Sequence, residues 1–340
     1  MTGHGLPSPE ACSVRFDAED ISAYGTAARA HFFVALEQPG PWGRDAATQS
    51  HLPVAVGSSL SEACAARGGR LTLLRRPGRH ADEHHPGGHA AYLAWAGVDP
   101  WLLEVRLDDP ATLLEVDLDA LARGDRAAVT ASLPGLAPAA PVLLVCTNGR
   151  RDVCCAVRGR PVALDAAALV PGRVWEASHT GGHRFAPTGV LLPHGATFAR
   201  LAAPLCAEIL AAAETGTLPA GVSGPRHDRG RSTLEPGAQA AEAHVRHVVD
   251  ERSLTALTTA LLSTDAIGAA GLAGADGDGG DGGDHLHHGE HVDFLVTHRD
   301  GRAWRVGCMQ SSRGPLSESC GKAPVPVAVW HVLHCELVSV

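Results

Sequence analysis

Short apolar runs alternate with helix-like stretches along the first two thirds of the chain, and this alternation constrains the fold more than any other feature. A helix-like stretch, SSLSEACAARG (58–68), follows the first of these runs. Four strand-like runs precede residue 110, namely HFFVAL (31–36), LTLLRR (71–76), AYLAWA (91–96) and WLLEVRL (101–107). Strands that alternate with helices predict an α/β fold with a mixed sheet, and α+β is the alternative.

The middle third repeats the alternation in a more compact form. VLLVC (142–146) is a continuous apolar run typical of a buried strand, and RVWEASH (173–179) and GVLLPHG (189–195) are predicted as the next two. Residues 155–170 predict a partial helix, interrupted early by Gly159 and Pro161. A longer Ala/Leu helix is expected from Thr197, as its N-cap, to about Thr215. This order and size are those of a thioredoxin-like domain.

Changes in composition divide the chain into three predicted regions. Hydrophobicity falls and prolines appear at 122–141, which separates an N-terminal α/β region (1–135) from the middle domain (139–220). The strand order of the N-terminal region is compatible with a degenerate thioredoxin-like unit. The C-terminal region (221–340) predicts a helix at 238–249 and a small sheet with strands at 292–298, 302–309 and 325–333. Asp300-Gly301 predicts a hairpin between the first two of these strands. The Gly/Asp/His tract at 271–291 is predicted to be disordered.

Composition excludes several classes of function. The formal net charge of −9 argues against a nucleic-acid-binding protein. No apolar run reaches the roughly 18 residues that a membrane span needs, and the N-terminus resembles no secretory signal. The cytoplasm is therefore expected. There, nine cysteines indicate metal binding or redox chemistry rather than structural disulfides.

One constellation of cysteine and histidine carries chemistry. Cys146 ends the predicted strand 142–146, and the vicinal pair Cys154-Cys155 follows after a polar loop. His179 and His183 follow the next strand and are separated by Thr-Gly-Gly, whose glycines permit a tight backbone path. Two thiolates and two imidazoles suit tetrahedral Zn²⁺ as well as an iron–sulfur cluster with two histidines on one iron. The spacing alone also leaves a chance arrangement open.

These residues carry a family resemblance. Residues 141–201, from PVLLVCTNGRRDVCC through HTGGHRFAPTGVLLPHGATFARL, resemble the sucrase/ferredoxin-like proteins, relatives of the thioredoxin-like [2Fe-2S] ferredoxins. The resemblance implies a [2Fe-2S] cluster with Cys146 and Cys155 on one iron, and His179 and His183 on the other. In those ferredoxins a C-x3-C pair holds the two places taken here by histidine. The family register selects Cys155, which leaves Cys154 as a spare thiol.

The resemblance implies single-electron transfer at a raised reduction potential, with unidentified donor and acceptor proteins. An electron carrier is expected rather than a stand-alone enzyme. Glycoside hydrolysis is excluded because no supported carboxylate pair is present. The alternatives are a zinc-stabilised Cys2His2 binding module without catalysis and a thiol–disulfide oxidoreductase, although the chain contains no C-x-x-C.

The other cysteines and the histidine-rich tract receive no role from their spacing. Cys206 is expected to be an inert core thiol. Cys308, Cys320 and Cys335 are interpreted as buried or idle, with a second metal or redox site as the alternative. The tract DHLHHGEH (284–291) is interpreted as a linker, with Ni²⁺ or Zn²⁺ binding as the alternative. The arginines beside the predicted ligands, Arg150, Arg151 and Arg184, are interpreted either as hydrogen-bonding or docking groups or as a solvated surface.

Overall fold

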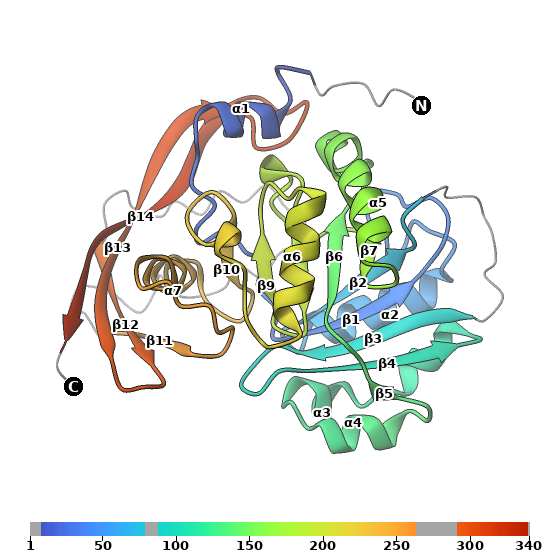
Figure 1. Ribbon diagram of the computed structural model, residues 1–340. Helices are drawn as coiled ribbons and strands as arrows, with labels where there is room; N and C mark the ends of the chain where they lie inside the picture. The colour runs from blue at the N-terminus through green and yellow to red at the C-terminus, as the bar shows by residue number, and fades with distance from the viewer. Residues whose placement is uncertain (1–7, 79–87, 263–290, 339–340) are drawn as a thin grey trace.

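The computed structural model describes residues 8–78, 88–262 and 291–338. These residues form a ten-stranded mixed sheet with helices packed on it and a separate four-stranded antiparallel sheet near the C-terminus (Figure 1). The predicted α/β class is confirmed. The domain boundaries stay a prediction. Strands that precede the predicted boundary at residues 135–139 and strands that follow it belong to the same sheet.

The large sheet has the strand order β10-β9-β8-β6-β7-β2-β1-β3-β4-β5. Its strands are β1 (Phe32–Glu37), β2 (Gly69–Arg75), β3 (His89–Trp95), β4 (Trp101–Leu107), β5 (Ala137–Pro138), β6 (Val142–Cys146), β7 (Val174–Ala177), β8 (Gly189–Leu192), β9 (Ala196–Phe198) and β10 (Asp228–Arg231). The pairs β1–β2 and β6–β7 are parallel, and the others are antiparallel.

The order β-α-β-β-β-α occurs twice along this sheet. In the first half, β1 and β2 flank α2, and β3 and β4 precede α3 and α4; in the second half, β6 and β7 flank α5, and β8 and β9 precede α6. Each half has the same spatial order, β2-β1-β3-β4 and β7-β6-β8-β9. The helices are α2 (Val54–Ala65), α3 (Leu118–Ala122), α4 (Arg126–Ser132), α5 (Arg160–Leu169) and α6 (Ala203–Ala213), and short 3-10 turns are η1 (Pro110–Glu115), η3 (His183–Phe185) and η4 (Ala220–Val222).

The two halves meet at a short antiparallel seam between β2 and β7. Leu74 pairs with Ala177 there, and Arg75 pairs with Glu176. The Arg75 Nε atom donates to Glu176 Oε2 at 2.9 Å, and both side chains are buried. Beyond the seam, the two halves share one apolar cluster, in which Tyr92 and Trp175 meet edge to face with ring centroids 5.9 Å apart. The halves therefore pack as one body.

The C-terminal part forms a second core. Its sheet has the order β11-β12-β13-β14, and helix α7 packs on it. The hairpin of β13 and β14 extends beyond this core and lies beside α1 at the top of Figure 1, where apolar side chains of both elements share one cluster. The elements are α1 (Cys12–Ala18), α7 (Pro236–Val248), β11 (Leu257–Leu261), β12 (His291–His298), β13 (Ala303–Leu316) and β14 (Val325–Val338).

Several local predictions are confirmed and one is wrong. The strand at 142–146 and the Asp300-Gly301 turn are present, the latter with Gly301 at φ 96°. Thr197 is not a helix N-cap: it lies in β9, and α6 begins after Ala202. Residues 155–170 form an α-helix only in part, as predicted: Cys155–Gly159 is a π-helical turn, and Pro161 lies in the first turn of α5, where a proline has no intrahelical bond to lose. Residues 80–87 and most of the 271–291 tract lie outside the described residues.

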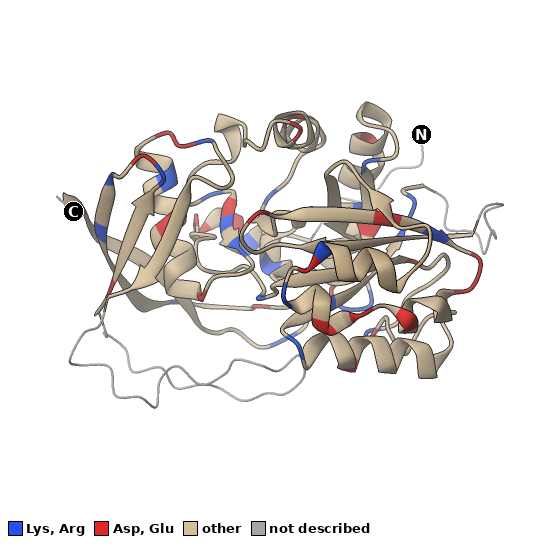
Figure 2. Cartoon of the chain, turned by 90° about the horizontal axis from the view of Figure 1, so that it is seen from below, with Lys and Arg blue, Asp and Glu red and all other residues tan. Residues whose placement is uncertain are grey.

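Basic and acidic residues are interspersed along the described elements rather than separated onto different parts of the chain (Figure 2). None of the described helices is both long enough and apolar enough to cross a membrane.

Candidate metal centre

Cys146 and Cys155 lie together at the carboxyl end of β6. Cys146 is the last residue of the strand, and Cys155 begins a π-helical turn, η2 (Cys155–Gly159), that leads into α5. Both thiols are buried and hydrogen-bonded to each other. The turn can approach the strand because residue 159 is glycine: a Cβ there would lie 2.3 Å from the Cys146 carbonyl oxygen. The glycine interpreted as a helix interruption therefore has a packing role.

His179 and His183 are brought to the same place by the loop after β7. Gly181 and Gly182 have φ values of 81° and 68°, which a side chain would strain, and they fold the loop so that His183 begins η3. The two imidazole rings have centroids 6.1 Å apart. His179 is hydrogen-bonded to Cys146. The structure thus brings together all four residues predicted from the sequence.

The contacts in this group favour a thiolate at Cys146. The hydrogen bond from Cys155, and then that from His179, lowers the pKa of Cys146 despite burial, whereas the pKa of Cys155 is raised by its bond to Cys146 and by burial. Burial also lowers the pKa of His183, against the attraction of Asp152. A neutral imidazole beside a thiolate is the protonation state that metal binding requires.

The histidines also have unused hydrogen-bonding capacity. The Nδ1 atoms of His179 and His183 are both buried without a hydrogen-bond partner, which is costly for a polar atom. The other nitrogen of His183, Nε2, lies 3.7 Å from Asp152 Oδ2. A buried imidazole with one unpartnered nitrogen and a carboxylate near the other is typical of a metal ligand. These residues fit a bound metal centre.

A buried arginine lies beneath the histidine loop. The Arg229 side chain donates to the Gly181 carbonyl and to Thr26, and it occupies the space that a Cβ of Gly182 would need. Burial lowers its pKa to about 9, while the Cys146 thiolate favours the charged form. Its positive charge can offset negative charge in the thiol and imidazole group.

A second group of ligand-type side chains adjoins the first. The Sγ atom of Cys154 lies 3.6 Å from that of Cys12 and 3.2 Å from that of Cys320, and the Sγ atoms of Cys320 and Cys12 are 3.5 Å apart. Both carboxylate oxygens of Asp152 lie 3.8 Å from Cys12 Sγ. All four ligand atoms lie within 4.8 Å of one another.

Cys320 therefore contacts two other thiols, and Cys154 has a place of its own. Spacing did not reveal this group because Cys12 and Cys154 are 142 positions apart and Cys12 and Cys320 are 308 apart. The one available signal was the vicinal pair itself. Hydrogen bonding, first from Cys12, lowers the pKa of Cys154 to about 6, and burial raises that of Cys320 to about 11.

The other predicted cysteines differ in burial. Cys206 is fully buried in the core of the second half, as expected of an inert thiol, and Cys308 is buried in the C-terminal core. Cys335 is half-buried at the edge of that core. Of the arginines, Arg184 forms an ion pair with Glu318 at 3.3 Å, between the histidine loop and the β13–β14 hairpin.

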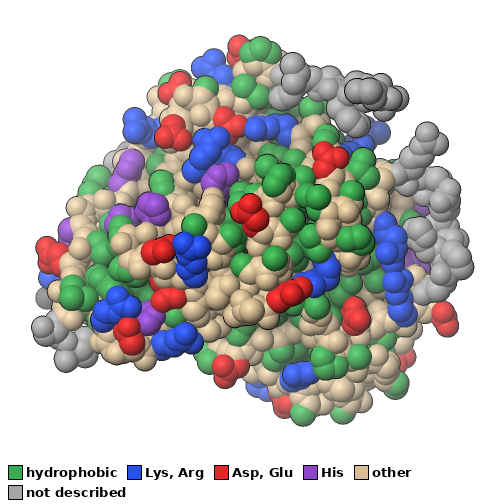
Figure 3. Space-filling view, viewed as in Figure 1, with side chains coloured by type: hydrophobic (Ala, Val, Ile, Leu, Met, Phe, Trp, Pro, Cys, Tyr) green, Lys and Arg blue, Asp and Glu red, His purple; other side chains and the backbone are tan. Residues whose placement is uncertain are grey.

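A third, more exposed group lies on the C-terminal sheet. The Nε2 atoms of His291 and His334 are each 3.3 Å from Asp293 Oδ1. The carboxylate of Asp293 also pairs with Arg305. Histidines gather over the C-terminal sheet and α7 in the space-filling view (Figure 3). The rest of the predicted 284–291 tract lies outside the described residues.

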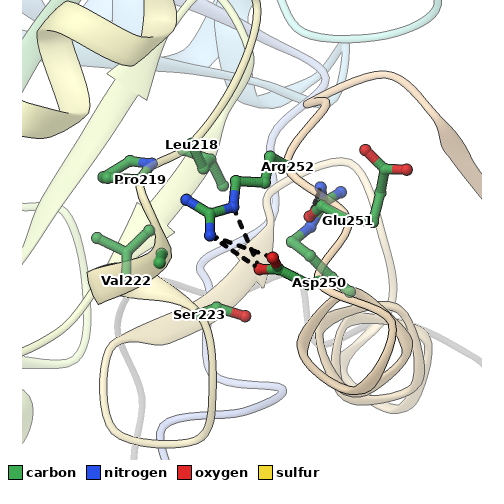
Figure 4. Close-up of a pocket in the computed structure, with 9 residues that line it drawn as sticks. Leu218, Pro219, Val222, Ser223, Asp250, Glu251 and Arg252 are labelled. Atoms are coloured by element: carbon green, nitrogen blue, oxygen red, sulfur yellow. Dashed lines mark hydrogen bonds and ion pairs between the residues drawn. The ribbon is translucent and has the colours of Figure 1, made fainter.

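A small pocket lies away from all three groups, between Leu218–Val222 and the segment after α7 (Figure 4). Arg252 and Asp250 form an ion pair at 3.1 Å within it. Its lining residues include neither cysteine nor histidine.

The fold and the buried thiol–imidazole group define an α/β protein with a candidate site for a soft metal centre. The model of the family described as sucrase/ferredoxin-like matches residues 23–220, and the chain belongs to this family. The matched segment contains Cys146, Cys155, His179 and His183, whereas Cys12 and Cys320 lie outside it. No curated protein and no solved structure matches the chain.

Proposed function

We propose that this chain is a one-electron redox protein that holds one [2Fe-2S] cluster on Cys146, Cys155, His179 and His183. The observation that carries the proposal is the convergence of two buried thiols and two imidazoles, each imidazole with a buried unpartnered nitrogen. Cysteine and histidine together are the ligands of Rieske-type clusters. Membership of the sucrase/ferredoxin-like family supports the same conclusion.

The spread of the four side chains favours a cluster over a single zinc ion. Ligand atoms of one tetrahedral Zn²⁺ ion lie within about 3.8 Å of one another, given zinc–sulfur bonds of about 2.3 Å. Among the described residues, two groups have three or more ligand atoms within 4.8 Å of each other, and the Cys146 group is not one of them. A two-iron cluster bridges a wider gap than one ion does.

The protein residues set the properties of the site. When bound, a [2Fe-2S] cluster would supply one-electron oxidation and reduction. Two neutral imidazoles in place of two thiolates make the ligand set less negative, which favours the reduced state and raises the reduction potential. Buried Arg229 acts in the same direction. Asp152, 3.7 Å from His183 Nε2, is placed to hold a proton on that nitrogen.

The contact between the Cys146 and Cys155 thiols also suggests a second redox function, thiol–disulfide exchange. Such a protein needs an attacking thiolate that is exposed to its substrate. Cys146 is 1% exposed and Cys155 is 0% exposed. The burial of both thiols therefore favours the metal centre.

Anaerobic purification of the full chain, followed by iron and acid-labile sulfide analysis and by visible and EPR spectroscopy, tests the proposal. We expect about two iron and two sulfide per chain, a brown-red colour and an EPR signal after one-electron reduction. Cys146→Ser should abolish all three, whereas Cys206→Ser, which alters a buried core thiol outside the thiol–imidazole group, should leave iron and sulfide unchanged. A colourless protein with zinc bound through Cys146 would contradict the proposal in favour of the zinc-stabilised module.

A further inference from the structure

We propose that Cys12, Cys154, Cys320 and Asp152 form a second metal site, separate from the cluster, which binds one zinc-class divalent ion. The site needs neither iron nor the Cys146 group. It joins three distant parts of the chain: the start of α1, the loop before η2, and the loop between β13 and β14. Two of its four residues lie outside the segment that the family model matches.

The distances between the thiols suit a single tetrahedral ion. With zinc–sulfur bonds of about 2.3 Å, tetrahedral geometry places sulfur atoms about 3.8 Å apart. The three Sγ–Sγ distances are 3.2, 3.5 and 3.6 Å. With zinc–oxygen bonds of about 2.0–2.2 Å, a carboxylate oxygen would lie about 3.6 Å from each sulfur. Asp152 lies 3.8 Å from Cys12 Sγ. Three sulfurs and one oxygen therefore complete a closed, four-coordinate site.

The surroundings hold these ligands in place. Asp152 accepts the backbone N–H of Cys154 at 2.9 Å, the backbone N–H of Cys320 at 2.8 Å and the Ser319 hydroxyl at 2.8 Å. Cys12 and Cys154 are buried in a small apolar cluster, and Cys320 packs against its edge. Hydrogen bonds that orient the ligating carboxylate are a regular feature of metal sites. The carboxylate is thus fixed toward the thiols without a metal.

A disulfide explains the group less well. A disulfide joins two sulfurs at about 2.05 Å, and here three sulfurs are almost equidistant. Any one disulfide would leave the third thiol buried beside the Asp152 carboxylate. A divalent ion uses all three thiols and the carboxylate together, and it balances their negative charge.

The test measures zinc and iron separately on the full chain. Protein purified anaerobically from zinc-supplemented cells is analysed for both metals, for wild type, Cys320→Ser and Cys335→Ser. Cys335 is the matched control, since it too is half-buried and lies on the same hairpin. We expect about one zinc per chain in the wild type and in Cys335→Ser. In Cys320→Ser, zinc should fall to less than about a tenth, with iron retained.

Zinc K-edge absorption spectroscopy of the wild type identifies the ligands. Three sulfurs at about 2.3 Å and one oxygen at about 2.0–2.2 Å are expected. Three results would each overturn the proposal. They are wild-type protein without zinc, zinc retained in Cys320→Ser, and a disulfide that mass spectrometry of anaerobic protein finds at Cys12, Cys154 or Cys320. The zinc content and the zinc ligands decide this proposal, whereas the iron content of the wild type decides the cluster proposal, so the two can fail separately. If Cys320→Ser is insoluble, Cd²⁺ binding to the wild type gives the same decision. Binding is measured by the sulfur-to-metal absorption of Cd²⁺, and prior alkylation of Cys320 should block it.

Discussion

Cys154 and Cys155 are neighbours in the chain, yet their thiols face different groups of ligands. Cys155 is hydrogen-bonded to Cys146, whereas Cys154 lies 3.2 Å from Cys320. The turn of η2 separates the two side chains in this way. Cys155 is therefore the thiol of this pair that we propose as a cluster ligand, and it is also the one that the family register selects.

Serine substitutions at these two positions should have opposite effects on metal content. Cys155→Ser should lose iron and sulfide and retain zinc, because it removes a cluster ligand and leaves the Cys12 group intact. Cys154→Ser should retain iron and sulfide and lose zinc. Both metals would be measured on the same samples by inductively coupled plasma mass spectrometry. Loss of iron from Cys154→Ser with full iron in Cys155→Ser would reverse the assignment.

The reduction potential should depend on pH if His183 binds the cluster. Reduction adds negative charge, so a ligating imidazole binds its outer proton more strongly in the reduced state. The midpoint potential should then fall as pH rises, by up to about 59 mV per pH unit for each proton coupled to one electron. His183→Cys should keep a cluster, lower the potential and weaken the pH dependence. Protein-film voltammetry from about pH 6 to 10 measures both. A wild-type potential that is flat with pH and unchanged by the substitution would remove His183 from the iron.

The seam between the two halves should be sensitive to Arg75. Arg75→Met leaves Glu176 buried beside the Thr147 hydroxyl without the guanidinium that it pairs with. Removing one partner of a buried ion pair costs about 3–5 kcal/mol. Urea unfolding should show a loss of about this size. Arg67→Met is the control, because Arg67 pairs with Asp119 at the surface, where an ion pair contributes little, so the loss of stability should be much smaller than for Arg75→Met. Equal effects of the two substitutions would contradict the predicted role of the seam.

Stability should fall in mild acid because of His194. This residue lies in the turn between β8 and β9, is 9% exposed, and has a buried Nδ1 atom without a partner. Burial, and then the charge of Arg231, lowers its pKa from 6.5 to about 4. Between these values the unfolded chain binds the proton and the folded chain does not, so stability falls as pH drops from 6.5 toward 4.

The variant His194→Gln isolates this contribution. It cannot titrate, so its free energy of unfolding should depend less on pH over that range, by up to about 3 kcal/mol. Urea unfolding of both proteins at several pH values between 4 and 7 measures the difference. Parallel curves for the two proteins would show that His194 does not cause the loss.

The sequence predicts the elements whose pattern is local, whereas the choice of Cys146, Cys155, His179 and His183 as one ligand set came from the family resemblance. The strand at 142–146 is recognisable because five apolar residues run without a break, and Cys146, Cys155, His179 and His183 all follow strands of one β-α-β unit. The prediction of Thr197 as a helix N-cap is wrong. A good capping residue precedes an Ala/Leu run there, but pairing with β8 and β10 holds Thr197 in a strand. Cys12, Cys154 and Cys320 meet through tertiary packing alone, and no spacing rule reaches across 308 residues.

The separation of Cys12 and Cys320 has a consequence for synthesis of the chain. Cys320 leaves the ribosome 308 residues after Cys12. At 5–20 residues per second, that interval is roughly 15–60 s. All four residues of the Cys146 group emerge well before Cys320. During the interval Cys12 and Cys154 are open to oxidants and to mismatched metal ions. The order of translation therefore completes the three-thiol group only after the Cys146 group, and a chain that stops before residue 320 never completes it.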